Sequence, residues 1–445
     1  MKNPNELQGN LKRNYITNSS ATPVFSETRD KITEQSRDMD YAPICPYCQS
    51  KDTVKRGLRK KKYETAQLFL CNSCKKVFTG QLVKGKSFPL RLILEGLCLY
   101  NIGHTLEKTC MLLKEQFGLD VKVSTLSDWV KEFEDICAYS RMREFGMKLY
   151  SPNQVIQAVT LYHRQVYKFC IHRAKLALLL QDYKHKNFEN VREFLEAIQT
   201  ECPHQFFQEG ERASEENVKF DMSELVVREK QNFATRLATL ALQAVSDNKL
   251  RHQALQRFML CNDSVTVATE VPVYMDEMDI EHMQEVLGFR IPLPNADVET
   301  MPLAETDADI EKQSRQGLGP EGRVNVGAGK KPGSTSAPGR QPRLITGHID
   351  ILQIRNGSVH ILDYKPARSA KRDKPVSQLT IYALALSRLT GLRLFDFKCA
   401  WFDENAYFEF FPLHVVYKLR DKAKKEDPKQ MKWDTLIDPD VEKNK

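Results

Sequence analysis

Two aspartates and one lysine in the C-terminal part of this 445-residue chain have the types and spacing that metal-assisted hydrolysis requires. Asp350 lies in one apolar segment, and Asp363 and Lys365 close a second segment thirteen residues later. Neighbouring β-strands lie about 4.8 Å apart, so the two carboxylates can converge on one divalent ion, and the one-residue gap places Asp363 and Lys365 on the same side of their strand. A bound Mg²⁺ would activate water next to a phosphate, and Lys365 would orient that water or stabilise negative charge. The pattern predicts a site for phosphodiester hydrolysis.

The elements that must position these residues can be predicted from the same region. Residues 347–354 and 359–364 predict two strands, and the Asn-Gly pair between them at 356–357 predicts a hairpin turn. Three further elements flank this hairpin: a strand at 265–274, a helix at 377–389 closed by Gly391, and one or two strands within 395–411.

Three motifs in this region resemble the core of the PD-(D/E)XK nuclease superfamily, in particular its RecB-like exonuclease branch. They are G-H-I-D at 347–350, I-L-D-Y-K-P at 361–366 and Q-L-T-I-Y-A-L-A at 378–385. The resemblance implies an αβ core with a mixed central sheet, dependence on Mg²⁺ or Mn²⁺, and cleavage of DNA. Three motifs in the same order make a specific match, which a lone Asp-x-Lys would not.

The resemblance also implies a role for each matching residue. Asp350 and Asp363 would bind the metal ion, with the main-chain carbonyl of Tyr364 as a further ligand. Lys365 would be the catalytic lysine. Two residues spaced four apart on one helix face would help to place that lysine and the DNA strand: Gln378 and Tyr382.

Glu270 and His252 are weaker candidates from the same resemblance. Glu270 resembles the carboxylate on the strand before the first motif, and its alternative interpretation is a solvent-facing strand residue. His252 matches the branch's upstream histidine, which also contacts the metal, whereas a helical histidine is more often a surface or core residue. His163, Cys170 and His172 lie close together, but their spacing predicts no tetrahedral site, so packing is favoured for them.

Four cysteines near the N-terminus have the spacing of a two-knuckle zinc site. Cys45-x2-Cys48 and Cys71-x2-Cys74, separated by 22 residues, present four soft donors, and Zn²⁺ accepts four thiolates tetrahedrally. Four thiolates close the coordination sphere, so the predicted metal is structural, and the alternative is four unrelated buried cysteines. The nuclease branch sometimes holds an iron–sulfur cluster with three C-terminal cysteines, but only Cys399 follows the core here, so no such cluster is expected.

The positive charge of the chain is concentrated around these cysteines. The whole chain has 66 Lys and Arg against 58 Asp and Glu, whereas residues 45–90 hold eleven basic side chains against Asp52 and Glu64. An exposed basic hairpin would neutralise DNA phosphates, and the alternative is a solvated charged face. The residues expected to contact DNA are Lys55, Arg56, Arg59, Lys60, Lys61 and Lys62.

Two short helices are predicted after the cysteine segment, one at 105–113 and one that starts from a Ser124 cap. With the cysteine module they resemble the N-terminal zinc ribbon and helix-turn-helix of insertion-sequence transposases, over about residues 41–135. The resemblance implies DNA binding through the second helix, with four residues facing DNA: Ser124, Thr125, Ser127 and Lys131. The connection 114–122 is longer than the usual tight turn, which leaves the recognition helix open, and a purely structural helical bundle is the alternative.

Composition and length bound the class of protein. The chain is 41% hydrophobic and 28% charged, which is typical of globular proteins and excludes fibrous ones, and eleven cysteines in a long chain do not fit a disulfide scaffold. The polar start has no signal-peptide features and no apolar run would span a bilayer, so we expect no membrane partner and a cytoplasmic, nucleoid-associated protein.

We therefore predict an α+β multidomain chain. Its expected parts are a disordered tail at 1–40, a four-cysteine zinc ribbon at 41–82, a helix-turn-helix-like DNA-binding module at 83–140, a helical segment at 151–260, a PD-(D/E)XK nuclease core at 261–420 with a flexible insertion at about 301–343, and a charged tail at 421–445.

The predicted function is a DNA-targeting deoxyribonuclease with structural Zn²⁺ and catalytic Mg²⁺ or Mn²⁺. The alternative is a non-catalytic DNA-binding regulator or mobile-element accessory protein with an inactive nuclease-like core. A transposase of the DDE type fits less well, because its carboxylates are spread over a larger core than the hairpin of Asp350 and Asp363. Strand preference, polarity, recognised sequence and oligomeric state are not predicted.

Overall fold

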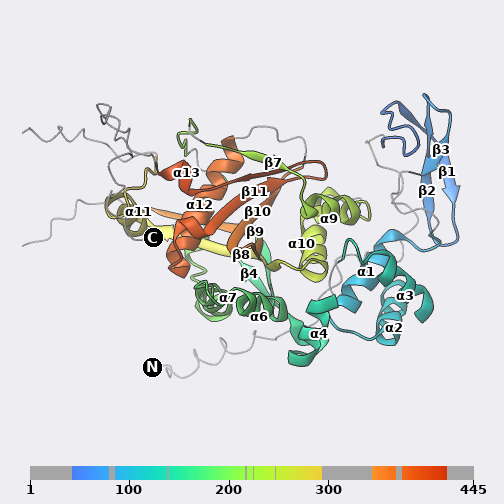
Figure 1. The fold of residues 1–445 in the computed structure, drawn as a ribbon, viewed down its shortest axis with the longest axis horizontal. Helices are drawn as coiled ribbons and strands as arrows, with labels where there is room; N and C mark the ends of the chain where they lie inside the picture. Colours follow the sequence, from blue (N-terminus) through green and yellow to red (C-terminus); the bar gives the residue numbers. More distant parts are fainter. Residues whose placement is uncertain are drawn as a thin grey trace, which may run out of the picture.

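The computed structural model describes residues 43–79, 86–137, 140–215, 218–223, 225–245, 247–292, 343–366 and 373–417. Within these ranges the chain forms thirteen α-helices and twelve β-strands (Figure 1). The predicted tails at 1–40 and 421–445, and the predicted insertion except Arg343, lie outside the described residues.

The strands have the following bounds: β1 (Thr53–Lys60), β2 (Thr65–Cys71), β3 (Val77–Thr79), β4 (Ile156–Tyr162), β5 (Val166–His172), β6 (Glu211–Arg212), β7 (Arg228–Lys230), β8 (Thr266–Asp276), β9 (Leu344–Arg355), β10 (Ser358–Tyr364), β11 (Phe397–Phe402) and β12 (Tyr407–Phe410).

The helices are α1 (Leu90–Asn101), α2 (Leu106–Phe117), α3 (Val123–Glu132), α4 (Ser140–Leu149), α5 (Pro152–Val155), α6 (Arg173–Asp182), α7 (Glu189–Glu201), α8 (Phe206–Glu209), α9 (Phe233–Leu242), α10 (Arg251–Asn262), α11 (Glu277–Glu285), α12 (Asp373–Thr390) and α13 (Leu413–Val416). None of these helices combines the length and the apolar character that a membrane span needs.

A mixed sheet forms the centre of the molecule. Its strand order is β4-β5-β8-β9-β10-β11-β12-β7. The short strand β6 pairs with the N-terminal end of β9, at Ile345 and Thr346. Only the β10–β11 and β6–β9 pairs are parallel among the described strands. The predicted hairpin is confirmed: β9 and β10 pair antiparallel, and Asn356 and Gly357 both have positive φ (51° and 67°), as the tight turns that join such strands require.

The prediction of a helical segment at 151–260 is wrong in part, because this segment contains the strands β4 to β7 as well as the helices α5 to α9. β4 and β5 lie inside it, pair with each other, and join the sheet through β8. Along β4 and β5, more buried residues tend to alternate with less buried ones. This two-residue period is that of a strand with one face on the core, whereas the sequences on either side have a helical period. The central sheet therefore draws strands from both sides of the predicted boundary at 260.

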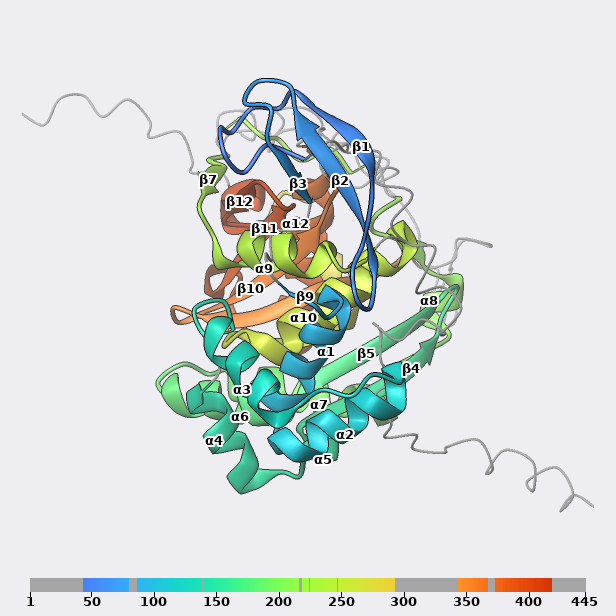
Figure 2. The ribbon, with the colours of Figure 1, turned by 90° about the vertical axis from the view of Figure 1, so that its right-hand side faces the viewer.

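Hydrophobic clusters cover both faces of this sheet. Residues of α6, α7 and α12 pack on one face. On the other face, α9 and α10 pack with α1, α2 and α3 in a single cluster, and Figures 1 and 2 show α9 and α10 between the sheet and α1. The helices predicted as a separate module at 83–140 thus share a core with the sheet.

The helices α1 to α3 differ in detail from the prediction. Helix α2 starts at a Thr105 cap, whose side chain accepts a hydrogen bond from the Lys108 N–H, and it continues to Phe117. The connection to α3 is therefore only 118–122, shorter than predicted. The Ser124 cap is wrong: α3 begins at Val123 after Lys122 with no side-chain cap, so Ser124 is already the second residue of the helix.

Candidate active site and metal centres

Three carboxylates lie abreast on neighbouring strands. Glu270 faces Asp350 because the register pairs Thr269 with Ile351 and Val271 with Ile349. The pairing of Leu362 with Ile351 places Asp363 next to Asp350 on the other side. Directly opposed residues in antiparallel strands have Cβ atoms about 4.5–5.5 Å apart, so Asp350 lies between Glu270 and Asp363, and its charge acts on both of them.

Asp350 lies in the middle of its strand, whereas Asp363 lies next to the last residue of β10. Strand β10 stops at Tyr364, and β6 pairs with β9 only at Ile345 and Thr346. On this side of β9, β10 pairs with residues 351–355 and β6 pairs with residues 345–346. Asp350 lies in the unpaired stretch between them. The convergence of the aspartates is confirmed, but it depends on this break in the pairing of β9.

Asp363 and Lys365 form the closest ion pair of the site. Lys365 Nζ lies 2.7 Å from Asp363 Oδ2, and the side chains are 30% and 4% exposed. Burial and the neighbouring Asp350 raise the pKa of Asp363 well above its usual range, although Lys365 opposes this shift. Burial alone would lower the pKa of Lys365, but Asp363 and Asp350 outweigh it and raise the pKa, so the amine stays an ammonium.

Asp350 is held by a histidine and a backbone amide. His252 Nδ1 of α10 lies 3.4 Å from Asp350 Oδ2, and the Tyr364 N–H donates to the same oxygen at 3.3 Å. Burial works against ionisation of Asp350, but the contact with His252 and the charge of Lys365 outweigh it and lower the pKa. The structure thus brings His252 to the carboxylates and places the main chain of Tyr364 beside them.

Glu270 completes the acidic group from β8. Its φ of 52° lies in the left-handed region, a conformation that costs free energy for a residue with a side chain and that marks functional sites. Gln256 Nε2 donates to Glu270 Oε1 at 2.7 Å. Burial and the charge of Asp350 raise the pKa of Glu270 to about 8. The interpretation of Glu270 as a solvent-facing strand residue does not fit these contacts.

These residues fit a divalent cation. Asp363 Oδ2 is buried, and the Lys365 ammonium lies 2.7 Å from it. Oxygen donors are the ligands that Mg²⁺ and Mn²⁺ prefer, and a cation beside these carboxylates would offset the burial and the charge of Asp350 that raise the pKa values of Glu270 and Asp363.

Gln378 and Tyr382 bond to each other on α12. Gln378 Nε2 donates to the Tyr382 hydroxyl at 2.9 Å, and both side chains are buried. A Cβ atom at Gly347 would lie 2.2 Å from Tyr382 Cε1, so the Tyr382 ring rests directly on the backbone of β9, three residues before Asp350. These two residues therefore support the strand that carries Asp350.

Sequence reasoning missed Gln256 and Arg251 of α10. Gln256 holds Glu270, and Arg251 Nη2 donates to the Tyr364 hydroxyl at 3.1 Å. Gln256 stands four residues after His252, so both lie on one helix face. This i, i+4 spacing is the signal that could have identified Gln256.

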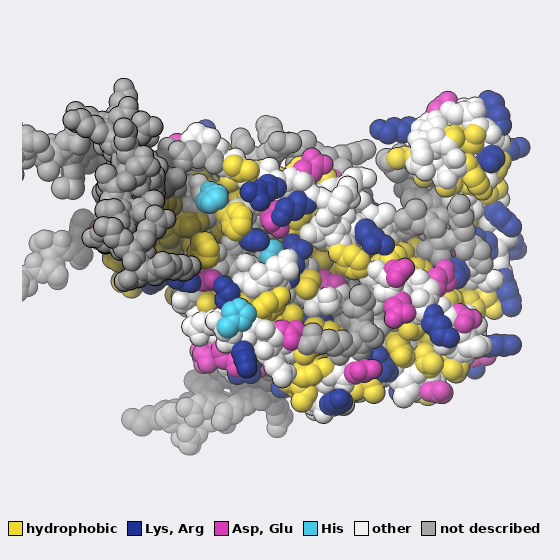
Figure 3. Space-filling view, in the orientation of Figure 1, with side chains coloured by type: hydrophobic (Ala, Val, Ile, Leu, Met, Phe, Trp, Pro, Cys, Tyr) yellow, Lys and Arg dark blue, Asp and Glu magenta, His cyan; other side chains and the backbone are white. Residues whose placement is uncertain are grey.

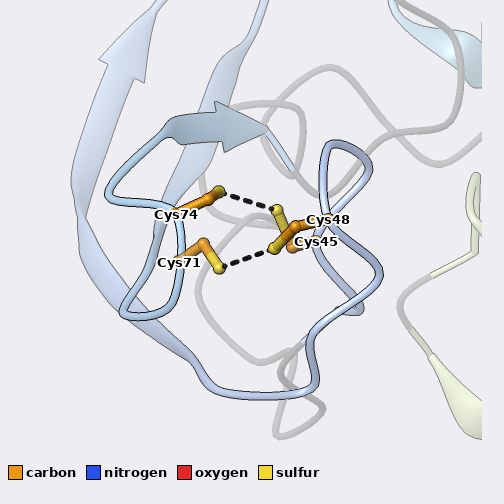
Figure 4. A group of neighbouring side chains, drawn as sticks. All are labelled: Cys45, Cys48, Cys71 and Cys74. Carbon is orange, nitrogen blue, oxygen red and sulfur yellow. Dashed lines mark hydrogen bonds between the residues drawn. The ribbon is translucent and has the colours of Figure 1, made fainter.

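The four N-terminal cysteines converge as predicted (Figure 4). Cys45 Sγ lies 3.6 Å from Cys74 Sγ, and Cys48 Sγ lies 3.5 Å from Cys71 Sγ. Four sulfurs at about 2.3 Å from a tetrahedral Zn²⁺ would be about 3.8 Å apart, so the group could hold such an ion with little movement. Each Cys-x2-Cys turn is followed by a residue with positive φ, Gln49 at 60° and Lys75 at 57°, so the two knuckles repeat one backbone design.

Four of the six basic residues expected to contact DNA lie on β1, an edge strand of the three-stranded sheet β1-β2-β3. All β1 side chains after Thr53 are exposed, including Lys55, Arg56, Arg59 and Lys60. Lys62 is also exposed, while Lys61 is partly buried and pairs with Glu64 at 2.7 Å. Figure 3 shows Lys and Arg side chains projecting along this end of the molecule.

The candidate DNA-facing residues of α3 share a partly open surface. Ser124 and Lys131 are exposed, and Thr125 and Ser127 are partly buried. The opposite side of α3 buries Leu126 and Trp129 against α1, where a Cβ atom at Gly96 would lie 3.1 Å from Leu126 Cδ1.

A second cluster of metal-binding side chain types was not predicted. His163 lies near Cys202 and His204 and not with Cys170 and His172. His172 instead caps α6 by accepting a hydrogen bond from the Lys175 N–H, which confirms a packing role for it. Burial and the neighbouring His204 lower the pKa of His163 to about 4, so its imidazole is neutral at physiological pH.

Residues 234–432 match the family model described as the PD-(D/E)XK nuclease superfamily. The C-terminal half of the chain therefore carries a domain of this superfamily, whose members are generally metal-dependent hydrolytic nucleases. The match covers β8 to β12 and α12, which hold all the candidate catalytic residues. No curated protein and no solved structure matched the chain.

Proposed function

We propose that the protein is a deoxyribonuclease that hydrolyses phosphodiester bonds with Mg²⁺ or Mn²⁺. The observation that carries the proposal is the group formed by Glu270, Asp350 and Asp363 on three adjacent strands, with Lys365 Nζ 2.7 Å from Asp363. The superfamily match to residues 234–432 supports hydrolysis by a metal-dependent nuclease.

In this proposal each residue of the site has a defined task. Asp350 and Asp363 would hold the metal ion, and Glu270, the carbonyl of Tyr364 and His252 are further candidate ligands. When bound, such an ion would supply an activated water and neutralise charge on the phosphate. Lys365 donates hydrogen bonds to the attacking water or to the phosphate oxygens; it does not act as a base, because its raised pKa keeps it protonated.

Four residues hold this arrangement in place. Gln256 fixes the Glu270 carboxylate, and Arg251 binds the hydroxyl of Tyr364. Gln378 orients Tyr382, which supports β9 from the α12 side. Catalytic groups keep their geometry only when neighbouring side chains restrain them, so these contacts belong to the proposed mechanism.

We infer that the N-terminal part binds the DNA substrate. The four cysteines would hold a structural Zn²⁺, and the exposed Lys and Arg side chains of β1 would contact phosphates. The α2–α3 pair would add a helix-turn-helix contact through the exposed part of α3. Aromatic contacts connect the ribbon to these helices. The ring of Tyr63, between β1 and β2, stacks on Phe88 with the ring centroids 4.8 Å apart, and Phe88 contacts Trp129 of α3 edge-on at 5.4 Å.

A cleavage assay tests the substrate class. The full-length protein is incubated with end-labelled single-stranded DNA, double-stranded DNA and RNA, each with Mg²⁺, Mn²⁺ or a chelator. We expect cleavage of at least one DNA substrate that requires the added metal. Cleavage of RNA alone would overturn the DNA assignment. Metal-independent cleavage would overturn the mechanism, and DNA binding without cleavage would favour the non-catalytic regulator.

A further inference from the structure

His163, Cys202 and His204 form a compact group that includes none of the candidate catalytic carboxylates. His163 follows β4, and the other two residues lie between α7 and α8. His163 Nε2 is 3.1 Å from His204 Nδ1 and 3.9 Å from Cys202 Sγ, and one ligand atom from each residue lies within 4.8 Å of the others. These atoms all point to one small volume.

The two separations measured from His163 Nε2 are close to edges of a zinc coordination tetrahedron, and the third pair of ligand atoms lies within 4.8 Å. Zn–N bonds of about 2.0–2.1 Å and a Zn–S bond of about 2.3 Å give N···N edges of about 3.3 Å and N···S edges of about 3.6 Å. The observed distances differ from these values by only a few tenths of an ångström. An ion could therefore enter with small side-chain rotations and without backbone movement.

The environment of His163 is that of a restrained ligand. His163 Nδ1 lies 2.7 Å from His348 Nε2, so Nδ1–H can donate to His348 and leave Nε2 free for a metal. The His163 ring stacks on Phe207 at 4.0 Å, and the His348 ring stacks on Tyr167 at 3.6 Å. Metal-bound histidines are usually oriented by such a second hydrogen bond.

We propose that His163, Cys202 and His204 bind Zn²⁺ at a second site, separate from both the four-cysteine group and the carboxylates. Two imidazoles and one thiolate suit the borderline-soft Zn²⁺ better than Mg²⁺. His163 is buried, Cys202 is partly buried and His204 is exposed, so the fourth position faces solvent and would take water. The proposal does not depend on the nuclease activity.

This zinc would join distant parts of the chain next to the active-site strand. It would tie the β4–β5 turn to the segment before α8 and, through His348, to β9. His348 lies two residues before Asp350, and alternate strand residues share a face. Zinc at this site would therefore stiffen the part of β9 that leads into the carboxylate group.

Metal analysis of the full-length protein tests the proposal. After purification with Zn²⁺ and removal of loose metal, we expect about two zinc ions per chain. His204→Ala should lose one, and the exposed His185→Ala should lose none. Cys71→Ser should lose the other ion, and the combined His204→Ala and Cys71→Ser variant should lose both. About one zinc in the wild type that disappears in Cys71→Ser would overturn the proposal, as would unchanged zinc in His204→Ala.

A Co²⁺ absorption spectrum distinguishes loss of a ligand from misfolding as the cause of metal loss. In a background with all four ribbon cysteines replaced by serine, Co²⁺ should give a thiolate charge-transfer band that disappears on Cys202→Ser and persists on Cys170→Ser. Circular dichroism of the helices and the central sheet should be the same in each of these variants. Absence of the band in this folded background, or its survival on Cys202→Ser, would show that Cys202 is not a ligand.

Discussion

At the scale of a single residue, the raised pKa of Glu270 makes the stability of the folded protein depend on pH. Its folded-state pKa of about 8 lies above the ordinary value of 4.5. The metal-free folded protein therefore keeps a proton on Glu270 that the unfolded chain releases near pH 4.5. The resulting contribution to stability is complete below pH 4.5 and is lost as pH rises toward 8.

We predict that Glu270→Gln removes part of this pH dependence. The free energy of unfolding in chelator, measured by urea between about pH 5 and 8, should fall with pH less steeply than in the wild type, by up to about 1.4 kcal/mol per pH unit. Glu285→Gln, at an exposed position on α11, is the control. Equal slopes for Glu270→Gln and the wild type would show that Glu270 titrates normally. Mn²⁺ affinity of the wild type should rise over the same pH range, because the metal must displace the proton.

Site residues could be predicted from the sequence where the members of the site lie close together along the chain. Asp350, Asp363 and Lys365 were accessible because a short Asn-Gly hairpin fixes their register locally. His163 meets His204 across 41 residues and His348 across 185, so no local pattern joins them. The positive φ of Glu270 also left no mark in the sequence, since glutamate rarely adopts that conformation.

At the scale of elements, β9 depends on its contact with α12. Gly347→Ala would place a Cβ atom 2.2 Å from Tyr382 Cε1, and the ring is held by Gln378. We predict a loss of about 1–3 kcal/mol in the free energy of unfolding, as for overpacked cores. In a Tyr382→Leu background the same substitution should cost much less. A Gly347→Ala protein as stable as the wild type in urea would contradict the close packing.

We predict that the basic side chains of β1 contribute to DNA binding. Arg59→Ala with Lys60→Ala should weaken duplex binding and reduce the slope of log K against log salt by about one to two, since each lost phosphate contact removes about 0.9. The control is Lys148→Ala with Lys184→Ala, which removes the same charge from exposed positions on and after other helices. Fluorescence anisotropy at several salt concentrations measures both. An equal effect of the two double variants would indicate general charge and not a β1 contact.

Elements with a clear period were predicted, and those with conflicting patterns were not. The sequence of α9 has a continuous apolar stripe, and this helix lies within the segment 151–260 that was predicted to be helical. Strands β4 and β5 were missed because they lie between helices and expose one face to a greater extent than the strands at the centre of the sheet. Their place in the sheet is fixed by pairing with β8, a contact between distant segments.

At the scale of the whole molecule, α1 is locked to α10 by a buried ion pair. Glu95 and Arg257 form a salt bridge with side chains 0% and 12% exposed. The charges of Glu95 and of the nearby cysteines offset burial and raise the pKa of Arg257, so it stays charged. The ribbon, in contrast, has a small cluster of its own around Phe69 and Phe78.

We predict that Glu95→Ala destabilises the helices and the sheet together. It leaves a buried guanidinium without its partner, which costs about 3–5 kcal/mol. The control, Glu189→Ala, breaks an exposed pair with Arg192 and should cost less than about 1 kcal/mol. Urea unfolding followed by hydrogen exchange should show one transition for α1 to α3 and the sheet. Separate unfolding of these helices would contradict the shared core.

In the proposed mechanism, the carboxylates of adjacent strands bind the metal ion that DNA cleavage requires. The most direct measurement compares wild-type, Asp363→Asn and Asp135→Asn proteins for Mn²⁺ binding and for single-turnover DNA cleavage. Asp135 is exposed and lies far along the chain from the site, so its substitution is the control. We predict that Asp363→Asn loses Mn²⁺ affinity and slows cleavage on the order of 10²-fold or more, while Asp135→Asn changes neither. Wild-type cleavage by a folded Asp363→Asn protein would contradict the account.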